Sequence, residues 1–146
     1  MTTKFQVCIP SRHADVLRRA AALSYPRECC GLLVGEGETS ITVTDVVPTE
    51  NIAENPAQAF EIDPQAHFDL LRRVRGSARR VIGHFHSHPH GPAHPSPRDL
   101  AMAHDPEAVW VLVTPTATPR AFLRPEGTAH FVEVPVTISE IEVNAP

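Results

Sequence analysis

The chain has 146 residues, of which 42% are hydrophobic, and its formal net charge is -4 at pH 7. This length and apolar content predict a single domain over residues 1–146 with a core of its own. The acidic balance and the lack of any Lys or Arg run longer than a pair argue against a general nucleic-acid-binding protein.

The number and spacing of the cysteines and the length of the apolar runs bear on the cellular compartment of the protein. Cys8, Cys29 and Cys30 show no Cys-x-x-Cys spacing, and their odd number favours a reducing environment over a disulfide framework. The sequence shows no charged-then-apolar leader and no apolar run near the ~20 residues that cross a bilayer. We therefore expect a cytoplasmic protein without a membrane partner.

The first part of the chain predicts a strand, a helix and a β-hairpin. Alternating apolar residues predict a strand over residues 4–9, and an apolar stripe at helical spacing predicts a helix over residues 12–24. The stripe consists of Ala14, Leu17 and Ala21. Segments 28–34 and 39–47 flank a Gly-containing turn and predict the two strands of a hairpin.

The middle of the chain predicts a long loop followed by a helix. Residues 48–60 show no clear period, so they predict a loop, which is either a groove wall or a plain connector. Asp63 and Pro64 are typical of a helix start, and the helix is expected to run to about residue 75. Phe68, Leu71 and Val74 are expected to face inward.

The last part of the chain predicts mainly strands. Residues 108–113 form the most apolar run and predict a strand buried on both faces, beside the strand of residues 81–88. Segments 120–124 and 129–134 flank a Pro- and Gly-containing turn and predict a second hairpin. The tail after about residue 135 is either an edge strand or disordered. The fold class is therefore α/β, a mixed β-sheet with flanking helices.

The segment from residue 81 to residue 103 carries the strongest functional signal. His84, His86 and His88 alternate along a predicted strand, so their side chains share one face, and Pro89 ends the strand. Imidazoles two residues apart on a strand can converge on one cation. The spacing therefore predicts a metal site.

A helix-start signature follows this strand after a Gly/Pro-rich loop. Ser96, Pro97 and Asp99 occupy the N-cap, first and third positions of a short predicted helix. One interpretation is a structural capping box. The other is that Asp99 supplies a carboxylate as the third metal ligand, and Ser96 can serve both interpretations because a hydroxyl accepts and donates at once.

These residues resemble the signature of the JAMM (MPN-plus) zinc metalloproteases. His86-Ser87-His88-Pro89 is followed after six residues by Ser96-Pro97-Arg98-Asp99, as in His-x-His-Pro and Ser-x-x-Asp. Upstream, residues 26–35 resemble the family's Pro-x-Glu-x-x-Gly-Leu-Leu-x-Gly, which nominates Glu28. The resemblance spans residues 5–132 and implies the cytidine-deaminase-like MPN fold.

The resemblance also implies a reaction. His86, His88 and Asp99 would hold Zn²⁺, Glu28 would act as general base, and Ser96 would stabilise an oxyanion. The expected reaction is amide or isopeptide hydrolysis at the C-terminus of a ubiquitin-like or sulfur-carrier protein. A homodimer is compatible with the resemblance.

Two other functions use the same residue types. Two histidines and one carboxylate also describe a non-haem iron oxygenase, although such sites commonly place the acid two residues after the first histidine. A non-catalytic MPN scaffold is the other alternative, but such scaffolds have lost ligands that this chain retains. Four further histidines near the motif, His84, His90, His94 and His104, are expected to be surface or supporting groups. Cys29 and Cys30 are expected to be packing thiols.

Overall fold

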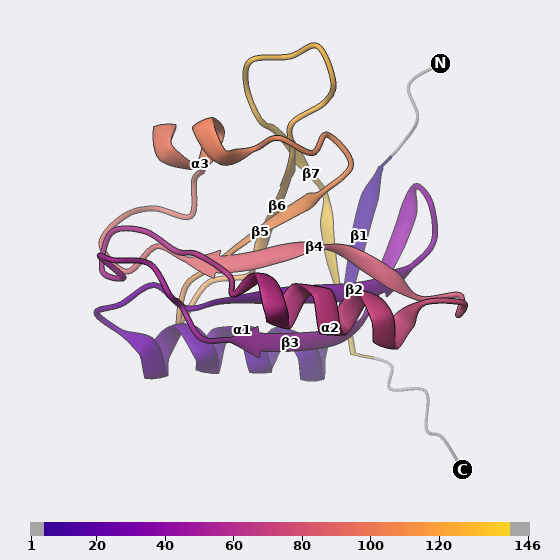
Figure 1. Cartoon of the computed structure of the whole chain (residues 1–146), viewed down its shortest axis with the longest axis horizontal. Coiled ribbons are helices and arrows are strands. Elements are labelled where there is room, and N and C mark those ends of the chain that lie inside the picture. Colours follow the sequence, from indigo (N-terminus) through magenta and orange to yellow (C-terminus); the bar gives the residue numbers. More distant parts are fainter. Residues whose placement is uncertain (1–4, 141–146) are drawn as a thin grey trace.

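The computed structural model describes residues 5–140, and its three helices and eight strands follow one another as β1-α1-β2-β3-α2-β4-α3-β5-β6-β7-β8 (Figure 1). The helices are α1 (Ser11–Ser24), α2 (Pro64–Val74) and α3 (Pro97–Met102). The strands are β1 (Gln6–Pro10), β2 (Cys30–Glu36), β3 (Ser40–Thr49), β4 (Arg80–Ser87), β5 (Val109–Val113), β6 (Arg120–Leu123), β7 (Val132–Val134) and β8 (Val136–Ser139).

All eight strands belong to one mixed sheet, in the order β7-β6-β5-β4-β2-β3-β1-β8. The predicted hairpins β2–β3 and β6–β7 pair antiparallel, and β4 pairs antiparallel with β2 and parallel with β5. The expected α/β class and the expected neighbourhood of β4 and β5 are therefore confirmed. The strand that carries the histidines lies inside the sheet, with partners on both edges.

The sheet is covered by helices on both faces (Figure 1). The predicted stripe of α1, Ala14, Leu17 and Ala21, is buried in one core cluster with Leu33 and Phe85. Leu70 and Val74 of α2 pack with Leu32 and Val34 of β2 in a second cluster. Since successive strand side chains alternate between faces, β4 directs Phe85 towards α1 and directs His84 and His86 to the opposite face.

The expected inward face of α2 was partly wrong. Leu70 and Val74 are buried, at 2% and 6% exposure, whereas Phe68 and Leu71 are 52% and 45% exposed. The helix meets the sheet through an i, i+4 pair, and Leu71 is turned about 100° from Leu70 around the axis. Leu71 instead borders a surface groove of about 1000 Å³.

Several predicted boundaries shift by one or two residues. β4 ends at Ser87, so His88 lies just beyond the strand, and β3 extends through Thr49 into the segment that was predicted as loop. The tail forms an edge strand, β8, which pairs parallel with β1. Residue 4 of the predicted first strand and residues 141–146 of the tail lie outside the described residues. Within residues 5–140, no helix combines the length and apolar character needed to cross a membrane.

Candidate metal and catalytic site

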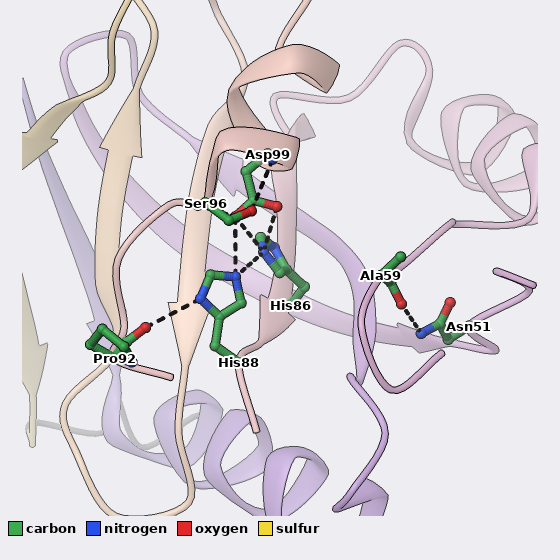
Figure 2. Close-up of polar contacts among 7 residues, drawn as sticks. All are labelled: Asn51, Ala59, His86, His88, Pro92, Ser96 and Asp99. Atoms are coloured by element: carbon green, nitrogen blue, oxygen red, sulfur yellow. Dashed lines mark hydrogen bonds and ion pairs between the residues drawn. The ribbon is translucent and has the colours of Figure 1, made fainter. Parts of the chain in front are cut away.

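Two histidines at the end of β4 direct ring nitrogens towards the same point (Figure 2). His86 is fully buried, and its Nε2 lies 3.0 Å from Nε2 of His88. Nδ1 of His88 lies 3.2 Å from the Pro92 carbonyl oxygen, and because a carbonyl only accepts, this contact puts the proton on Nδ1. Because Nδ1 is engaged by Pro92, Nε2 of His88 is the ring nitrogen that faces His86 and Asp99, and it is the atom available to a metal.

Asp99 joins the two histidines from α3 (Figure 2). Its Oδ2 lies 3.2 Å from Nε2 of His86 and 3.1 Å from Nε2 of His88. The same carboxylate oxygen accepts from the Ser96 N–H at 2.9 Å, and the Asp99 N–H donates to Ser96 Oγ at 3.1 Å. The capping box is formed, so one side chain both caps α3 and belongs to the histidine cluster.

The protonation states within this cluster follow from burial and hydrogen bonding. Burial opposes ionisation of Asp99, but its hydrogen bonds with His86 and His88 outweigh burial and hold the pKa of Asp99 well below its usual range. Burial lowers the pKa of His86, which keeps this ring neutral near neutral pH. A carboxylate and a neutral imidazole are the forms that bind a cation.

Glu28 reaches the same site from a different part of the sequence. In the antiparallel β2–β4 pair Cys30 lies opposite His86, and continuing this register by two residues brings Glu28 opposite His88. Its side chain is only 8% exposed, and burial raises the pKa of Glu28 to about 7. Ligand-type atoms of Glu28, His86 and His88 all lie within 4.8 Å of one another.

The donor atoms fit a zinc ion. Tetrahedral zinc with ligands at about 2.0–2.1 Å holds neighbouring ligand atoms roughly 3.3 Å apart. The three separations among Nε2 of His86, Nε2 of His88 and Oδ2 of Asp99 are 3.0, 3.2 and 3.1 Å. Two imidazoles and one carboxylate are also a donor set that leaves a fourth zinc position open, as catalytic sites require.

A cavity of about 180 Å³ opens beside the cluster. Glu28, Ser96 and Asp99 line it, together with an aromatic wall of Phe60, His84 and Trp110. The larger groove of about 1000 Å³ also reaches His84 and Trp110, so it borders the same part of the sheet. The arrangement can hold a cation, accept a proton at Glu28 and admit an extended chain.

The other histidines lie outside the cluster. His90, His94 and His104 are exposed. His84 shares its face of β4 with His86, but its ring packs edge-on against Trp110, with ring centroids 4.3 Å apart. Burial lowers the pKa of His84 to about 3. Its buried Nδ1 has no hydrogen-bond partner among residues 5–140. His84 is therefore a neutral cavity wall.

The two adjacent cysteines are packing groups. Cys29 and Cys30 are 7% and 1% exposed, and burial raises the pKa of the Cys30 thiol to about 11. Burial also raises the pKa of Cys29. Protonated, buried thiols are poor nucleophiles.

Two contributors to this site were missed by sequence reasoning. Phe60 stacks on the His86 ring, with centroids 4.1 Å apart and planes 17° from parallel. Asn51 donates through Nδ2 to the carbonyl oxygen of Glu28. The same Nδ2 donates to the carbonyl oxygen of Ala59 (Figure 2). Both belong to the segment that was predicted as a loop without periodicity. A lone aromatic residue at its end was the only available signal, and it was weak.

The mixed sheet, with two histidines and an acid gathered at the end of an internal strand, agrees with the MPN fold that the sequence resemblance implies. A family model described as prokaryotic homologs of the JAB domain matches residues 10–125. The chain belongs to this prokaryotic JAB family, the small JAMM-type proteins.

Individual relatives agree with this assignment. A desampylase of Haloferax volcanii is 34% identical over 98 residues, which cover 67% of this chain and 70% of the relative. A probable TtuB-protein conjugate cleaving protease of Thermus thermophilus is 37% identical over 117 residues, which cover 78% and 70%. The solution structure of a Desulfitobacterium hafniense protein superimposes with a TM-score of 0.80 at 26% identity, covering 92% of this chain and 94% of that chain.

Proposed function

We propose that this protein is a zinc-dependent isopeptidase that hydrolyses the amide bond at the C-terminus of a ubiquitin-like or sulfur-carrier protein. The observation that carries this proposal is the convergence of His86, His88 and Asp99 within 3.2 Å, at the rim of a cavity that Glu28 and Ser96 also line. An amide hydrolase needs an electrophile, a base and an oxyanion donor around one point. Glu28 would be the base and Ser96 the oxyanion donor. The two histidines and Asp99 would hold a metal ion as the electrophile.

His86, His88 and Asp99 are the proposed zinc ligands. When bound, zinc supplies Lewis acidity, which polarises a carbonyl and lowers the pKa of water to ~7. The protein contributes the orientation of its own groups. The Pro92 carbonyl fixes the tautomer of His88, and the Ser96 N–H holds the Asp99 carboxylate in place.

Glu28 is the proposed proton carrier. Its carboxylate lines the same cavity as Asp99 and Ser96, so it can take a proton from the attacking water and return that proton to the departing amine. Ser96 is the proposed oxyanion donor. Its Oγ accepts from the Asp99 N–H at 3.1 Å, which leaves the hydroxyl hydrogen free to donate to the developing oxyanion.

The substrate class rests on the relatives and on the groove. The names of two relatives describe a desampylase and a protease that cleaves TtuB-protein conjugates. The groove along the sheet reaches the cavity through His84, Met102 and Trp110, which suits an extended tail rather than a folded surface. Glycines at the scissile end would let the carbonyl approach the ligand cluster closely.

We assign residues 1–146 to one domain because every described strand belongs to the same sheet. Free Cys8, Cys29 and Cys30 suit a reducing compartment, which supports a cytoplasmic enzyme. A homodimer remains compatible with the fold.

The experiment uses fusions of candidate ubiquitin-like carriers whose C-terminal Gly-Gly is joined to a reporter peptide. Mass spectrometry should find cleavage after Gly-Gly, little cleavage of a matched Ala-Ala fusion, and loss of nearly all cleavage with Glu28→Gln, because an amide cannot accept the proton. Equal cutting of both fusions would refute the glycine-tail substrate. Zinc-loaded enzyme that cuts neither would favour a scaffold, and bound iron with oxygen-dependent turnover would favour an oxygenase.

A further inference from the structure

Asn51 has every hydrogen-bonding position of its side-chain amide filled by backbone groups. Its Nδ2 donates to the carbonyl oxygen of Glu28 at 3.0 Å. It also donates to the carbonyl oxygen of Ala59 at 2.9 Å (Figure 2). Its Oδ1 accepts from the N–H groups of Ala53 and Glu61, both at 3.0 Å. An amide offers two donors and two acceptor lone pairs, so this side chain is saturated by one loop and by Glu28.

The same loop also binds the backbone N–H of Glu28. The Glu28 N–H donates to the carbonyl oxygen of Pro56 at 2.7 Å. Glu28 lies before β2 begins, so sheet pairing does not fix its own peptide groups. The loop of residues 51–61 supplies that constraint instead, through one backbone bond and one Asn51 bond.

The loop also contacts the histidine cluster. Asn51 binds the carbonyl oxygen of Ala59, and Phe60 is the next residue in the chain. The Phe60 ring stacks on the His86 ring, with centroids 4.1 Å apart. Among the described residues the loop forms no strand, and its ends are joined by a single isolated bridge between Asn51 and Ile62. One side chain therefore ties the backbone of Glu28 to the segment that packs on His86.

We infer that Asn51 is a positioning residue, which sets the distance between the Glu28 carboxylate and the His86–His88–Asp99 cluster through its bonds to Glu28 and Ala59. This inference rests on the proposed function of Glu28 as proton carrier. A base that must meet a water held at a fixed point tolerates little displacement, and a misplacement near 1 Å can cost on the order of 100-fold in rate.

The test compares Asn51→Ala and Asn51→Asp with wild type in cleaving the carrier Gly-Gly reporter fusion. Asp removes both Nδ2 donors and so breaks the bonds to Glu28 and Ala59, but it retains an acceptor for the Ala53 and Glu61 N–H groups. We expect kcat to fall by roughly 10- to 100-fold in both variants with little change in KM and in zinc content. Amide hydrogen exchange should show Glu61 protected in Asn51→Asp and exposed in Asn51→Ala.

The matched control is Thr128→Ala. Thr128 is also half-buried and ties a turn, because its hydroxyl donates to the Pro125 carbonyl oxygen at 2.7 Å, but it lies in the β6–β7 connection. We expect its removal to leave kcat unchanged. The second control repeats the Asn51 substitutions in a Glu28→Asp background, where the carboxylate is already displaced. In that background the Asn51 substitutions should lower kcat by a several-fold smaller factor than in wild type, because both changes alter the position of the same carboxylate.

The outcomes separate this inference from the proposed function. Wild-type enzyme that cuts no fusion would remove the proposed function and this role together. If wild type cuts and Glu28→Gln does not, folded Asn51→Asp with wild-type kcat would overturn the positioning role alone. An equal loss in the wild-type and Glu28→Asp backgrounds, or a loss confined to KM, would also overturn it.

Discussion

Nε2 of His86 lies 3.0 Å from Nε2 of His88, and both face Oδ2 of Asp99. Two imidazole nitrogens and a carboxylate oxygen this close to one another are held together by a proton or by a cation between them. His88 already carries its proton on Nδ1, towards Pro92. The geometry therefore favours a shared cation, which leads to the first prediction.

We expect about one zinc per chain in wild type, and loss of most of it in His88→Ala and Asp99→Ala. Each substitution removes one of three converging donors, and a two-ligand site binds zinc weakly. Elemental analysis after dialysis measures the stoichiometry. His90→Ala is the matched control, because His90 is exposed and lies two residues from His88. Full zinc in either ligand variant would remove that residue from the site.

Ser96 has two roles that substitution can separate. Ser96→Ala removes both the helix cap and the hydroxyl, so it should lower stability by ~1 kcal/mol. Ser96→Gly retains most N-cap stability, with a cost of a few tenths of a kcal/mol, but lacks the hydroxyl. If the hydroxyl supports the oxyanion, both variants should lose kcat by on the order of 100-fold or more. Full turnover in folded Ser96→Gly would leave Ser96 as a cap alone.

Gly83 is a structural requirement of the strand that carries the histidines. A Cβ at this position would lie 2.0 Å from the Val109 carbonyl oxygen and 2.7 Å from its nitrogen, so β4 and β5 would have to separate. We expect Gly83→Ala to lower the free energy of unfolding by about 3 kcal/mol or more in urea titrations. Gly91→Ala is the control, since nothing lies within 4 Å of its Cβ, and a change within about 0.5 kcal/mol is expected. If Gly83→Ala and Gly91→Ala changed the free energy of unfolding equally, the close approach of β4 and β5 would be contradicted.

Thiol labelling tests the burial of the two cysteines next to Glu28. Because burial raises the pKa of Cys30 to about 11 and also raises that of Cys29, both thiols stay protonated and enclosed in the native protein near pH 8. Iodoacetamide should therefore modify half-buried Cys8 first, and all three cysteines only after unfolding. Peptide mass mapping identifies the modified positions. Rapid modification of Cys29 in native protein would indicate that the Glu28 segment opens.

Short-range patterns were predictable from the sequence because they follow local periodicity. The α1 stripe, the alternation of His84 and His86 on one face of β4 and the Ser96–Asp99 capping box each involve residues a few positions apart. The facing of α2 was not predictable to the same degree. Phe68, Leu71 and Val74 have suitable spacing, and Val74 is buried as predicted, but packing against β2 and β4 buries Leu70 and leaves Phe68 and Leu71 exposed.

The sequence by itself determined that His84, His86 and His88 would alternate at one strand end and that Ser96 and Asp99 would cap the next helix, since spacing and capping are properties of neighbouring residues. For Asp99 it allowed both a cap and a ligand, and the tertiary structure brought its carboxylate to the histidines. It nominated Glu28 only through a family motif. The tertiary structure brought Glu28 to the cluster, because the antiparallel register sets Cys30 opposite His86. It also joined Asn51 to Glu28 and Phe60 to His86. Those contacts join segments far apart in the chain, and only the packing of the complete sheet decides which segments meet.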